Sequence, residues 1–408
     1  MEKILIKNGR LVDPANNIDE KRDILIEDGK IKEVADCIMQ VGDAKEINAE
    51  GKAVMPGFID LHVHLREPGF EYKETVETGA KAAARGGVTS ICPMPNTKPV
   101  IDSAESVKDL LKRAENSPVH ILPIGACTVG QEGKELADIE GMKEAGIVAL
   151  SEDGKSVMDS SLFRKSLKEA ARLNLPMFSH CEDKALVEGG VMNAGKKAEE
   201  LGLPGITNSV EDVIVARDII MSKEAGNRLH LCHCSTADSV VLVEMAKKQG
   251  LSVSAEVCPH HFTMSDDEIT EDNGRFKMNP PLRSRADVDA LKEGLKNGIM
   301  EVISTDHAPH GEEEKNQTML KAPFGIVGLE TSFALGYTEL VDKGVLTLSQ
   351  LVEKMSVNPA KVLGIDKGNL AQGKPADIVI ADITEEYEID SKKFVSKGKN
   401  TPFDGKKV

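Results

Sequence analysis

Short apolar runs alternate with helical patterns over most of the chain, from Phe58 onward. The apolar runs are rich in β-branched residues, and most of them recur at intervals of about thirty residues, which is typical of successive βα units. Such units form a parallel sheet that is covered by helices. We interpret eight of the runs as strands, and they begin at Phe58, Val88, His120, Ile147, Pro176, Leu229, Ser252 and Glu301.

Eight strands of this kind predict a closed (β/α)8 barrel of the TIM type, and an uneven, doubly wound sheet is the structural alternative. Helical patterns over residues 71–85, ended by Gly86-Gly87, and over residues 160–172 fit between the strands. The intervals after the fifth and the seventh strand are longer, so we expect inserted loops there.

The two ends of the chain have a different texture from the barrel. Residues 1–55 contain short strands with turns at Asn8-Gly9, Asp28-Gly29 and Glu50-Gly51, which favour an antiparallel sheet. After a last helical region near residues 348–355, the segment GNLAQGKPADIVIAD again predicts a turn and a strand. We therefore expect a small β-sandwich domain built from residues 1–55 and 366–408, and a barrel over residues 56–365.

Composition narrows the class of function. The chain has 51 basic and 67 acidic residues, and its net charge of −16 argues against binding to nucleic acid or to anionic membranes. No apolar run reaches the roughly 18 residues that span a bilayer, and the N-terminal sequence lacks the apolar core of a secretory signal. Seven cysteines without a CxxC pair predict reduced thiols. We expect a cytoplasmic protein that acts on small molecules.

Histidine and aspartate residues follow several of the predicted strands. His62 and His64 are two residues apart in one strand, so both can point to one face and hold one metal ion, although such a pair is also common as a structural feature. Barrel enzymes build their sites at the carboxyl ends of the strands. Four more candidate ligands lie at such ends, namely Asp153, His180, His233 and Asp306.

Imidazole and carboxylate ligands together suit zinc or a similar divalent ion, and an acid that bridges two ions gives a two-metal site for hydrolysis. In that interpretation Asp306 both binds metal and carries a proton from water to the leaving nitrogen. Cys232 and Cys234 alternate with His233, and Cys181 is out of phase with His180, so we expect these thiols to pack against the helices.

The motifs resemble those of the amidohydrolase superfamily and, within it, of bacterial class I dihydroorotases. The resemblance covers essentially the whole chain. It implies reversible hydrolysis of dihydroorotate to N-carbamoyl-L-aspartate in de novo pyrimidine biosynthesis. The motifs are PGFIDLHVHLREPG, PMPNTKP, LSEDG, FSHCED, CHCS, NPPLR, STDHAPH and APFGIVGLET, in that order.

The resemblance also implies the ligands and partners. It places the metal ligands at the same six positions, with one or two zinc ions, two being expected, and with Asp153 as the bridge. Related enzymes use a carboxylated lysine instead, a role that Lys155 could take here. The family further suggests a homodimer and association with aspartate transcarbamoylase.

Substrate contacts follow from charge and from the resemblance. The guanidinium of Arg66 can bind a substrate carboxylate through two parallel hydrogen bonds. In a purely structural interpretation, Asn96 caps a turn, Asn279 braces a loop and His310 lies exposed in a loop. The resemblance implies substrate contacts from Arg66, Asn96, Asn279 and His310, and from the backbone of Phe324 and Gly325.

Some features keep alternative interpretations. We expect His260 and His261 to be supporting or packing groups, with direct substrate contact as the alternative. The charged segment over residues 310–325 is either a lid or a disordered surface loop. Two rival functions are a sister cyclic amidohydrolase, such as a hydantoinase or an allantoinase, and an inactive scaffold for aspartate transcarbamoylase.

Overall fold

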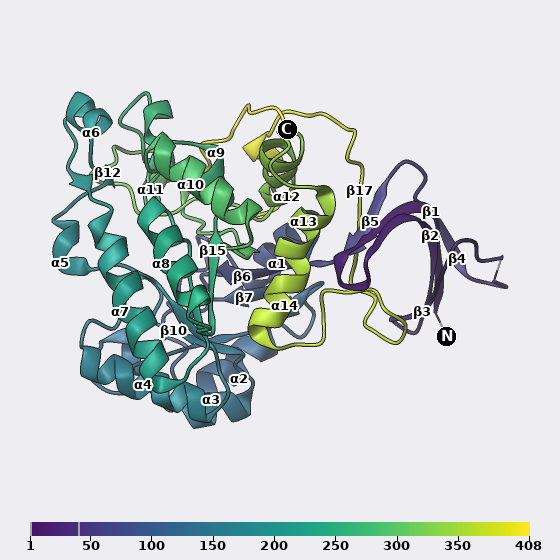
Figure 1. Cartoon of the computed structure of the whole chain (residues 1–408), viewed down its shortest axis with the longest axis horizontal. Helices are drawn as coiled ribbons and strands as arrows, with labels where there is room; N and C mark the ends of the chain where they lie inside the picture. The colour runs from purple at the N-terminus through teal and green to yellow at the C-terminus, as the bar shows by residue number, and fades with distance from the viewer. Residues whose placement is uncertain (1, 40) are drawn as a thin grey trace.

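The computed structural model describes residues 2–39 and 41–408, and it has a large α/β body with a smaller β-sheet at one end (Figure 1). Each of the eight predicted runs contains a strand. These are β6 (Phe58–Val63), β7 (Val88–Pro93), β8 (His120–Ile121) with β9 (Ile124–Ala126), β10 (Ala149–Ser151), β11 (Met177–Ser179), β14 (Leu229–Leu231), β15 (Val253–Val257) and β16 (Val302–Ile303).

The strands pair in parallel around the body. One sheet has the order β6-β7-β8 and the other has the order β9-β10-β11-β14-β15-β16, and β8 and β9 lie in the same run of chain. The segment after β16 returns to β6 through a parallel bridge between Val63 and His307, and the backbone nitrogen of His64 donates to the carbonyl of His307 at 2.8 Å. The predicted α/β barrel of the TIM type is therefore confirmed.

Alternation along the strands divides the core into two layers. One cluster of buried residues, which includes Ile59, Ile124 and Phe178, fills the barrel interior. Leu363 of α14 (Asn358–Leu363) joins this cluster and covers its amino end. The opposite faces of the strands pack against the surrounding helices, for example through Leu231.

The surrounding helices begin at local capping signals. α4 (Ser160–Arg172) has the predicted bounds, because Asp159 accepts from two backbone nitrogens of the first turn. α1 (Val76–Arg85) begins five residues later than predicted, since Thr75 forms the capping box and Glu74 bonds to His307 instead. The other long helices are α2 (Ala104–Arg113), α3 (Ile139–Ala145), α7 (Ser209–Ala225), α8 (Ala237–Lys248) and α10 (Arg285–Lys296).

The two long intervals carry additional short elements after β11 and β15. The first holds α5 (Lys184–Val187), β12 (Met192–Asn193), α6 (Lys196–Leu201) and β13 (Gly205–Ile206). The second begins with α9 (Pro259–Thr263). The helical pattern near residues 348–355 becomes α13 (Leu348–Val352) followed by a π-helical turn, Glu353–Val357, which leads into α14.

The chain ends form one six-stranded sheet. Its strands are β1 (Lys3–Asp13), β2 (Ile18–Glu27), β3 (Lys30–Ala35), β4 (Lys45–Asn48), β5 (Ala53–Pro56) and β17 (Ile378–Ala381). The order is β17-β5-β1-β2-β3, and β4 also pairs with β1. The pairings of β2 with β1 and β3 and of β17 with β5 are antiparallel. The expectation of an antiparallel sheet is confirmed for these pairings, but it is wrong for β4 and β5, which cross over and pair with β1 in parallel.

One predicted turn in this sheet is wrong. Asn8-Gly9 does not reverse the chain; it lies inside β1 at a bulge where the pairing register shifts, and Asn8 has φ of 67°. A Cβ atom on Gly9 would lie 2.4 Å from Val54, so the bulge also needs the space that glycine leaves. Asp28-Gly29 forms the predicted hairpin turn between β2 and β3, and both residues have positive φ.

β17 joins the sheet of the N-terminal strands, and the domain limits at residues 55 and 366 stay predictions. None of the helices in the described ranges has the length and apolar character that a membrane crossing requires. Within these same ranges all seven cysteines are free, and Cys37 is the exposed one.

Candidate metal centre

The six candidate metal ligands converge at the carboxyl ends of the barrel strands. His62 lies in β6 and His64 follows it directly, while His180 follows β11. Asp153 comes two residues after β10, His233 two residues after β14, and Asp306 three residues after β16. All six side chains are buried.

Asp153 lies at the centre of the group. Its Oδ1 is 3.2 Å from His62 Nε2, 3.4 Å from His180 Nδ1 and 3.9 Å from His233 Nε2. Two sets of three side chains, His62 with His64 and Asp153, and Asp153 with His180 and His233, each bring their ligand atoms within 4.8 Å of one another. A carboxylate shared by two such sets is suited to bridge two ions.

Asp306 completes the first set. Its Oδ1 lies 3.0 Å from His64 Nε2 and 3.5 Å from His62 Nε2. Asp306 and His233 both have positive φ, 47° and 34°, and Arg66 has φ of 62°. Non-glycine residues rarely adopt this conformation, and strained residues of this kind cluster at functional sites.

The backbone of His233 is also relevant to the placement of the neighbouring thiols. Cys232 continues the alternation of His230 and Leu231, so it packs in the barrel interior, and its sulfur lies within 4.8 Å of ligand atoms of His62 and Glu256. The left-handed conformation of His233 then breaks this alternation and lets the next side chain reach the site as well. The prediction that Cys232 packs against the helices is therefore wrong. Cys234 and Cys181 do pack with the helix-facing layer, as predicted.

Hydrogen bonds fix how the histidines face the centre. His62 Nδ1 contacts Glu256 at 2.8 Å, and His64 Nδ1 contacts the Oδ1 atom of Asn96 at 3.0 Å. With their Nδ1 atoms held by these contacts, both rings turn Nε2 toward a carboxylate, His62 toward Asp153 and His64 toward Asp306. In the described part of the chain, His62 Nε2 has no hydrogen-bond partner. A divalent cation satisfies this donor set, so the residues fit a metal site.

Glu256 of β15 and His230 of β14 support the site from within the barrel, and the sequence reasoning missed both. Glu256 accepts from His62 Nδ1, from His230 Nε2 at 3.0 Å and from the backbone nitrogen of His233 at 3.0 Å. Burial acts to raise the pKa of Glu256, but the hydrogen bonds from His230 and His62 outweigh it and lower the pKa. A polar residue at an inward strand position was the signal that could have identified them.

The electrostatics of the site hold Asp306 and His233 in the forms that bind a metal ion. Burial acts to raise the pKa of Asp306, but the charges of His62 and His64 outweigh it and lower the pKa to about 2. Burial, together with the charge of His180, lowers the pKa of His233 to about 3. At neutral pH the carboxylate is therefore ionised and the His233 ring is neutral, as metal ligation requires.

A cavity of about 250 Å³ opens over the centre. Arg66, Asn96, Asn279, Phe324 and Gly325 line it together with five of the six candidate ligands, whereas His62 lies behind its wall. Glu182, which the sequence reasoning did not single out, also lines it. Asn279 donates to the carboxylate of Glu182, which lies 3.7 Å from His180 Nε2.

His310 is buried next to Arg66 and outside this cavity wall, so the interpretation of an exposed loop residue is wrong. Its Nδ1 lies 3.2 Å from the Lys73 ammonium, which donates to it, so the ring proton is on Nε2, which donates to the carbonyl of Phe324 at 2.7 Å. Burial and the charges of Arg66 and Lys73 lower the pKa of His310 to about 2. The ring therefore stays neutral.

Lys155, the alternative bridging residue, is exposed and lies outside the cavity wall. The segment between His310 and Gly325 is packed rather than free. It contains α11 (Glu312–Lys315), and the buried Lys315 donates to the carbonyls of Lys277 and Pro323, both at 2.9 Å. Its movement as a lid stays a prediction.

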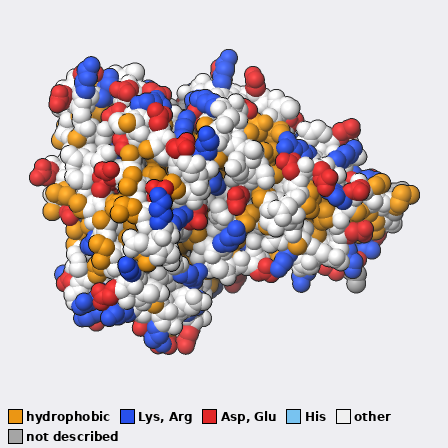
Figure 2. All heavy atoms as spheres, viewed as in Figure 1, with side chains coloured by type: hydrophobic (Ala, Val, Ile, Leu, Met, Phe, Trp, Pro, Cys, Tyr) orange, Lys and Arg blue, Asp and Glu red, His pale blue; other side chains and the backbone are white. Residues whose placement is uncertain are grey.

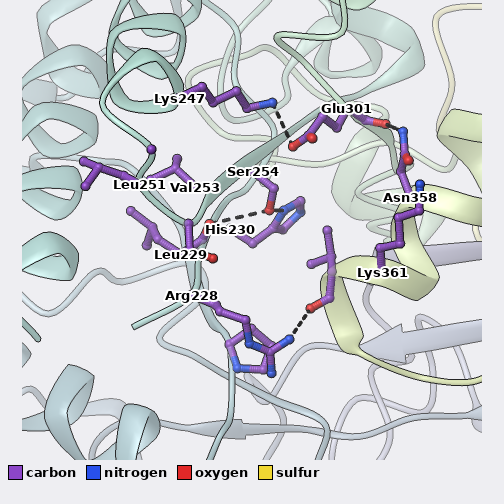
Figure 3. A pocket seen from close by; sticks show the side chains of 14 residues that line it. Arg228, Leu229, His230, Lys247, Leu251, Val253, Ser254, Glu301, Asn358 and Lys361 are labelled. Atoms are coloured by element: carbon purple, nitrogen blue, oxygen red, sulfur yellow. Dashed lines mark hydrogen bonds and ion pairs between the residues drawn. The ribbon is translucent and has the colours of Figure 1, made fainter. Parts of the chain in front are cut away.

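A second and larger cavity, of about 380 Å³, is lined by the first residues of β14 and β15, so it lies at the opposite end of the barrel. Figure 3 shows the side chains that line it. Several of its polar side chains are paired within the protein. Lys247 lies 2.8 Å from Glu301, and Arg228 donates to the carbonyl of Val362 at 3.0 Å. Asn358 donates to the carbonyl of Glu301 at 3.0 Å. This arrangement is typical of the stabilising end of a barrel.

Comparisons with known proteins agree with this geometry. A family model described as "Dihydro-orotase-like" matches residues 51–239. The dihydroorotase of Pelotomaculum thermopropionicum is 51% identical over 404 residues, which cover 99% of this chain and 94% of that protein. The dihydroorotase of Acetivibrio thermocellus is 49% identical over 406 residues, with 99% and 95% covered.

Solved structures with the same fold include cyclic amide hydrolases. The L-hydantoinase (dihydropyrimidinase) from Arthrobacter aurescens superposes with a TM-score of 0.88 at 29% identity, covering 100% of this chain and 93% of that one. The dihydropyrimidinase from Brevibacillus agri superposes with a TM-score of 0.86 at 26% identity, with 100% and 92% covered. The fold is thus shared with hydantoinases, whereas the much higher identities are to dihydroorotases.

Proposed function

We infer the activity from one premise: this chain belongs to the dihydroorotase family. It is a hydrolase that acts on a small cyclic amide, and it converts dihydroorotate reversibly to N-carbamoyl-L-aspartate in de novo pyrimidine biosynthesis. The observation that carries this conclusion is 51% identity over 99% of the chain to a dihydroorotase. The convergence of six metal-ligating side chains at one rim of the barrel argues against the inactive scaffold.

We propose the bacterial class I subtype, with two zinc ions and Asp153 as the bridge. His62, His64 and Asp306 would hold one ion with Asp153, and His180 and His233 would hold the other. A divalent ion held there supplies Lewis acidity, which activates water and polarises the amide carbonyl. The central position of Asp153, and the exposure of Lys155, support an aspartate bridge over a carboxylated lysine.

Asp306 is proposed as the proton carrier. Its ionised carboxylate lines the cavity and can accept a proton from the attacking water. The oxygen of that water bonds to the amide carbon, the bond from this carbon to the ring nitrogen breaks, and Asp306 returns the proton to the nitrogen. The reverse direction closes the ring and releases water.

Arg66 is proposed to bind the substrate carboxylate, because its half-buried guanidinium lines the cavity and its Nε–H is already oriented by the carbonyl of Pro309 at 3.1 Å. We propose further substrate contacts from Asn96, Asn279 and the backbone of Phe324 and Gly325. His310 would reach the substrate only if its Nε2–H turned away from the carbonyl of Phe324.

The test compares substrates and metals in one experiment. Formation of dihydroorotate from N-carbamoyl-L-aspartate is measured with and without prior chelation, then after readdition of zinc, cobalt or manganese. We expect turnover to be lost on chelation and restored by zinc. Turnover of hydantoin or allantoin in preference to dihydroorotate would assign the chain to a sister activity, and turnover that survives complete metal removal would contradict the metal site.

We also propose a homodimer, an association with aspartate transcarbamoylase and a cytoplasmic location. In support of a homodimer, α7 and α8 expose Val213, Ile220, Val241 and Met245 among charged side chains (Figure 2). Light scattering on the purified chain tests it. A dimer that becomes a monomer in Ile220→Asp supports this face as the interface, whereas a monomeric parent chain contradicts the dimer.

A further inference from the structure

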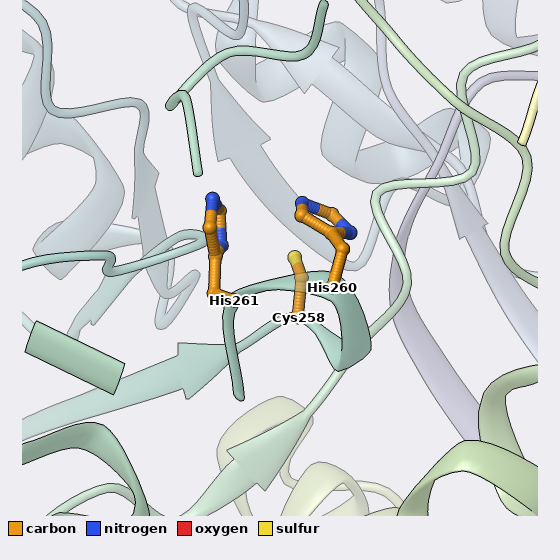
Figure 4. A group of neighbouring side chains, drawn as sticks. All are labelled: Cys258, His260 and His261. Atoms are coloured by element: carbon orange, nitrogen blue, oxygen red, sulfur yellow. The ribbon is translucent and has the colours of Figure 1, made fainter. Parts of the chain in front are cut away.

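Three buried side chains form a separate group of metal-ligand type beside the end of β15. Cys258 caps α9, and His260 and His261 lie in its first turn. Their ligand atoms lie within 4.8 Å of one another, and the side chains are at most 2% exposed. Figure 4 shows the three side chains projecting in the same direction, with the sulfur between the two rings.

Both histidines have a ring nitrogen that the protein leaves unused. His261 Nε2 donates to the carbonyl of Pro280 at 3.0 Å, so the neutral ring carries its lone pair on Nδ1. Neither this Nδ1 nor the buried Nε2 of His260 has a hydrogen-bond partner among residues 2–39 and 41–408. Buried polar atoms are normally paired, so two adjacent exceptions require an explanation.

A bound cation provides that explanation. A histidine that ligates a metal typically donates its other ring N–H to a carbonyl, which orients the ring, and His261 already has this arrangement with Pro280. Two imidazole nitrogens and a thiolate, with a fourth position open, suit a borderline-soft ion such as Zn²⁺.

The group is separate from the carboxylate-bridged centre. Among the described residues, none of these three side chains lines the 250 Å³ cavity. None of them belongs to either of the two groups of ligand side chains that contain Asp153. The donor types also differ, because the six candidate ligands of that centre supply only nitrogen and oxygen. We propose that the chain binds one additional thiophilic metal ion through Cys258, His260 and His261.

Cobalt provides a selective test, because a thiolate ligand gives Co²⁺ an intense near-ultraviolet charge-transfer band that nitrogen and oxygen ligands do not give. The purified full-length protein is stripped with a chelator, loaded with Co²⁺ and examined by absorption and by metal analysis. We expect the band in the parent chain. Cys258→Ser should lose the band and one equivalent of metal, and His261→Asn should lose that equivalent as well.

Two other buried cysteines serve as controls. Cys234→Ser removes a thiol of the helix-facing layer and should keep the band. Cys232→Ser removes the thiol near His62 and Glu256, and it should keep the band too. Circular dichroism verifies that each variant is folded.

The parent chain alone can overturn the proposal, because a fully loaded protein without the band has no sulfur ligand. A band that persists in folded Cys258→Ser, or that disappears in Cys232→Ser alone, would also overturn it. The readout does not depend on turnover, so failure here leaves the proposed hydrolase activity untouched.

Discussion

Both ends of the barrel open onto polar cavities, but the polar side chains at the two ends differ in how they are paired. At the amino end, Lys247 is paired with Glu301, and Arg228 donates to backbone carbonyls. At the carboxyl end, the Nε2 atoms of His62 and His180 have no hydrogen-bond partner among the described residues. The amino-end cavity is the larger of the two. Ring nitrogens without a hydrogen-bond partner, and not the size of the cavity, therefore distinguish the candidate metal site from the stabilising end of the barrel.

The largest effect should come from removing the proposed proton carrier, Asp306. Asp306→Asn should lower kcat by about 10³-fold or more, since general acid–base catalysis supplies up to about 10⁴-fold and a metal ligand is weakened as well. Steady-state turnover of dihydroorotate measures it. The matched change at the other end, Glu301→Gln, should leave kcat nearly unchanged. Equal losses in the two variants would remove the distinction between the ends.

Arg66→Ala should raise KM for dihydroorotate by about 10- to 100-fold, because charge-assisted hydrogen bonds to a carboxylate are lost. The effect on kcat should be smaller. Arg228→Ala at the amino end serves as the control and should not change KM. An unchanged KM in Arg66→Ala would assign carboxylate binding to another group.

Glu256→Gln should weaken metal binding roughly tenfold, the lower end of the range for residues that orient a ligand, because an amide oxygen can still accept from His62. Competition with a chelator of known affinity measures this loss. The buried carboxylate of Glu339, which pairs with Lys343, provides the control variant Glu339→Gln. If both variants bind the metal as tightly as the parent chain, the hydrogen bond from His62 to Glu256 does not contribute to metal binding.

The smallest effect concerns a buried cation at the carboxyl end. Burial, with the charge of Lys277 adding to it, lowers the pKa of Lys315 to about 7. In the unfolded chain Lys315 keeps its ordinary, higher pKa. Between about pH 7 and pH 10 the unfolded chain therefore binds one proton more than the folded chain at Lys315. Folding becomes more favourable as pH rises through this range. Below about pH 7 Lys315 is protonated in both the folded and the unfolded chain, so the full free-energy cost of burying its charge is present.

Replacing Lys315 with methionine should remove this dependence. The Tm of Lys315→Met relative to the parent chain should fall by about 2 to 4 °C between pH 7 and pH 9.5. Lys321→Met, which alters an exposed lysine of the same segment, should show no such trend. A difference for Lys315→Met that is constant with pH would mean that the ammonium stays charged in the folded protein.

The sequence predicted the barrel well because each strand carries its own pattern. Phe58 and Val88 begin strands as predicted, and Asp159 caps α4 at the predicted position. Long-range contacts explain the errors. Glu74 bonds to His307 and so cannot extend α1, and β4 and β5 are parallel to β1 because pairing direction depends on the path of the chain.

The sequence could predict which side chains meet at the candidate site, because the carboxyl ends of all barrel strands lie at one rim. His62 and Asp306 are far apart in sequence, yet the barrel topology brings them within 3.5 Å. What local pattern could not provide was the conformation of single residues. Counting alternation from His233 assigned Cys232 to the helix-facing layer, but the positive φ of His233 breaks that alternation, and Cys232 lies inside the barrel. Glu256 and His230 gave no motif, and their role depends on three-dimensional contacts.

The pairing of β17 with β5 sets the order in which the molecule can be completed. β5 leads directly into β6, which carries the candidate ligand His62. The antiparallel neighbour of β5 is made only when residues 378–381 leave the ribosome. During translation the edge of β5 therefore stays open, and nearly the whole barrel must emerge before it is covered. Nascent chains released earlier would expose an unpaired strand edge, which makes them targets for chaperones and proteases.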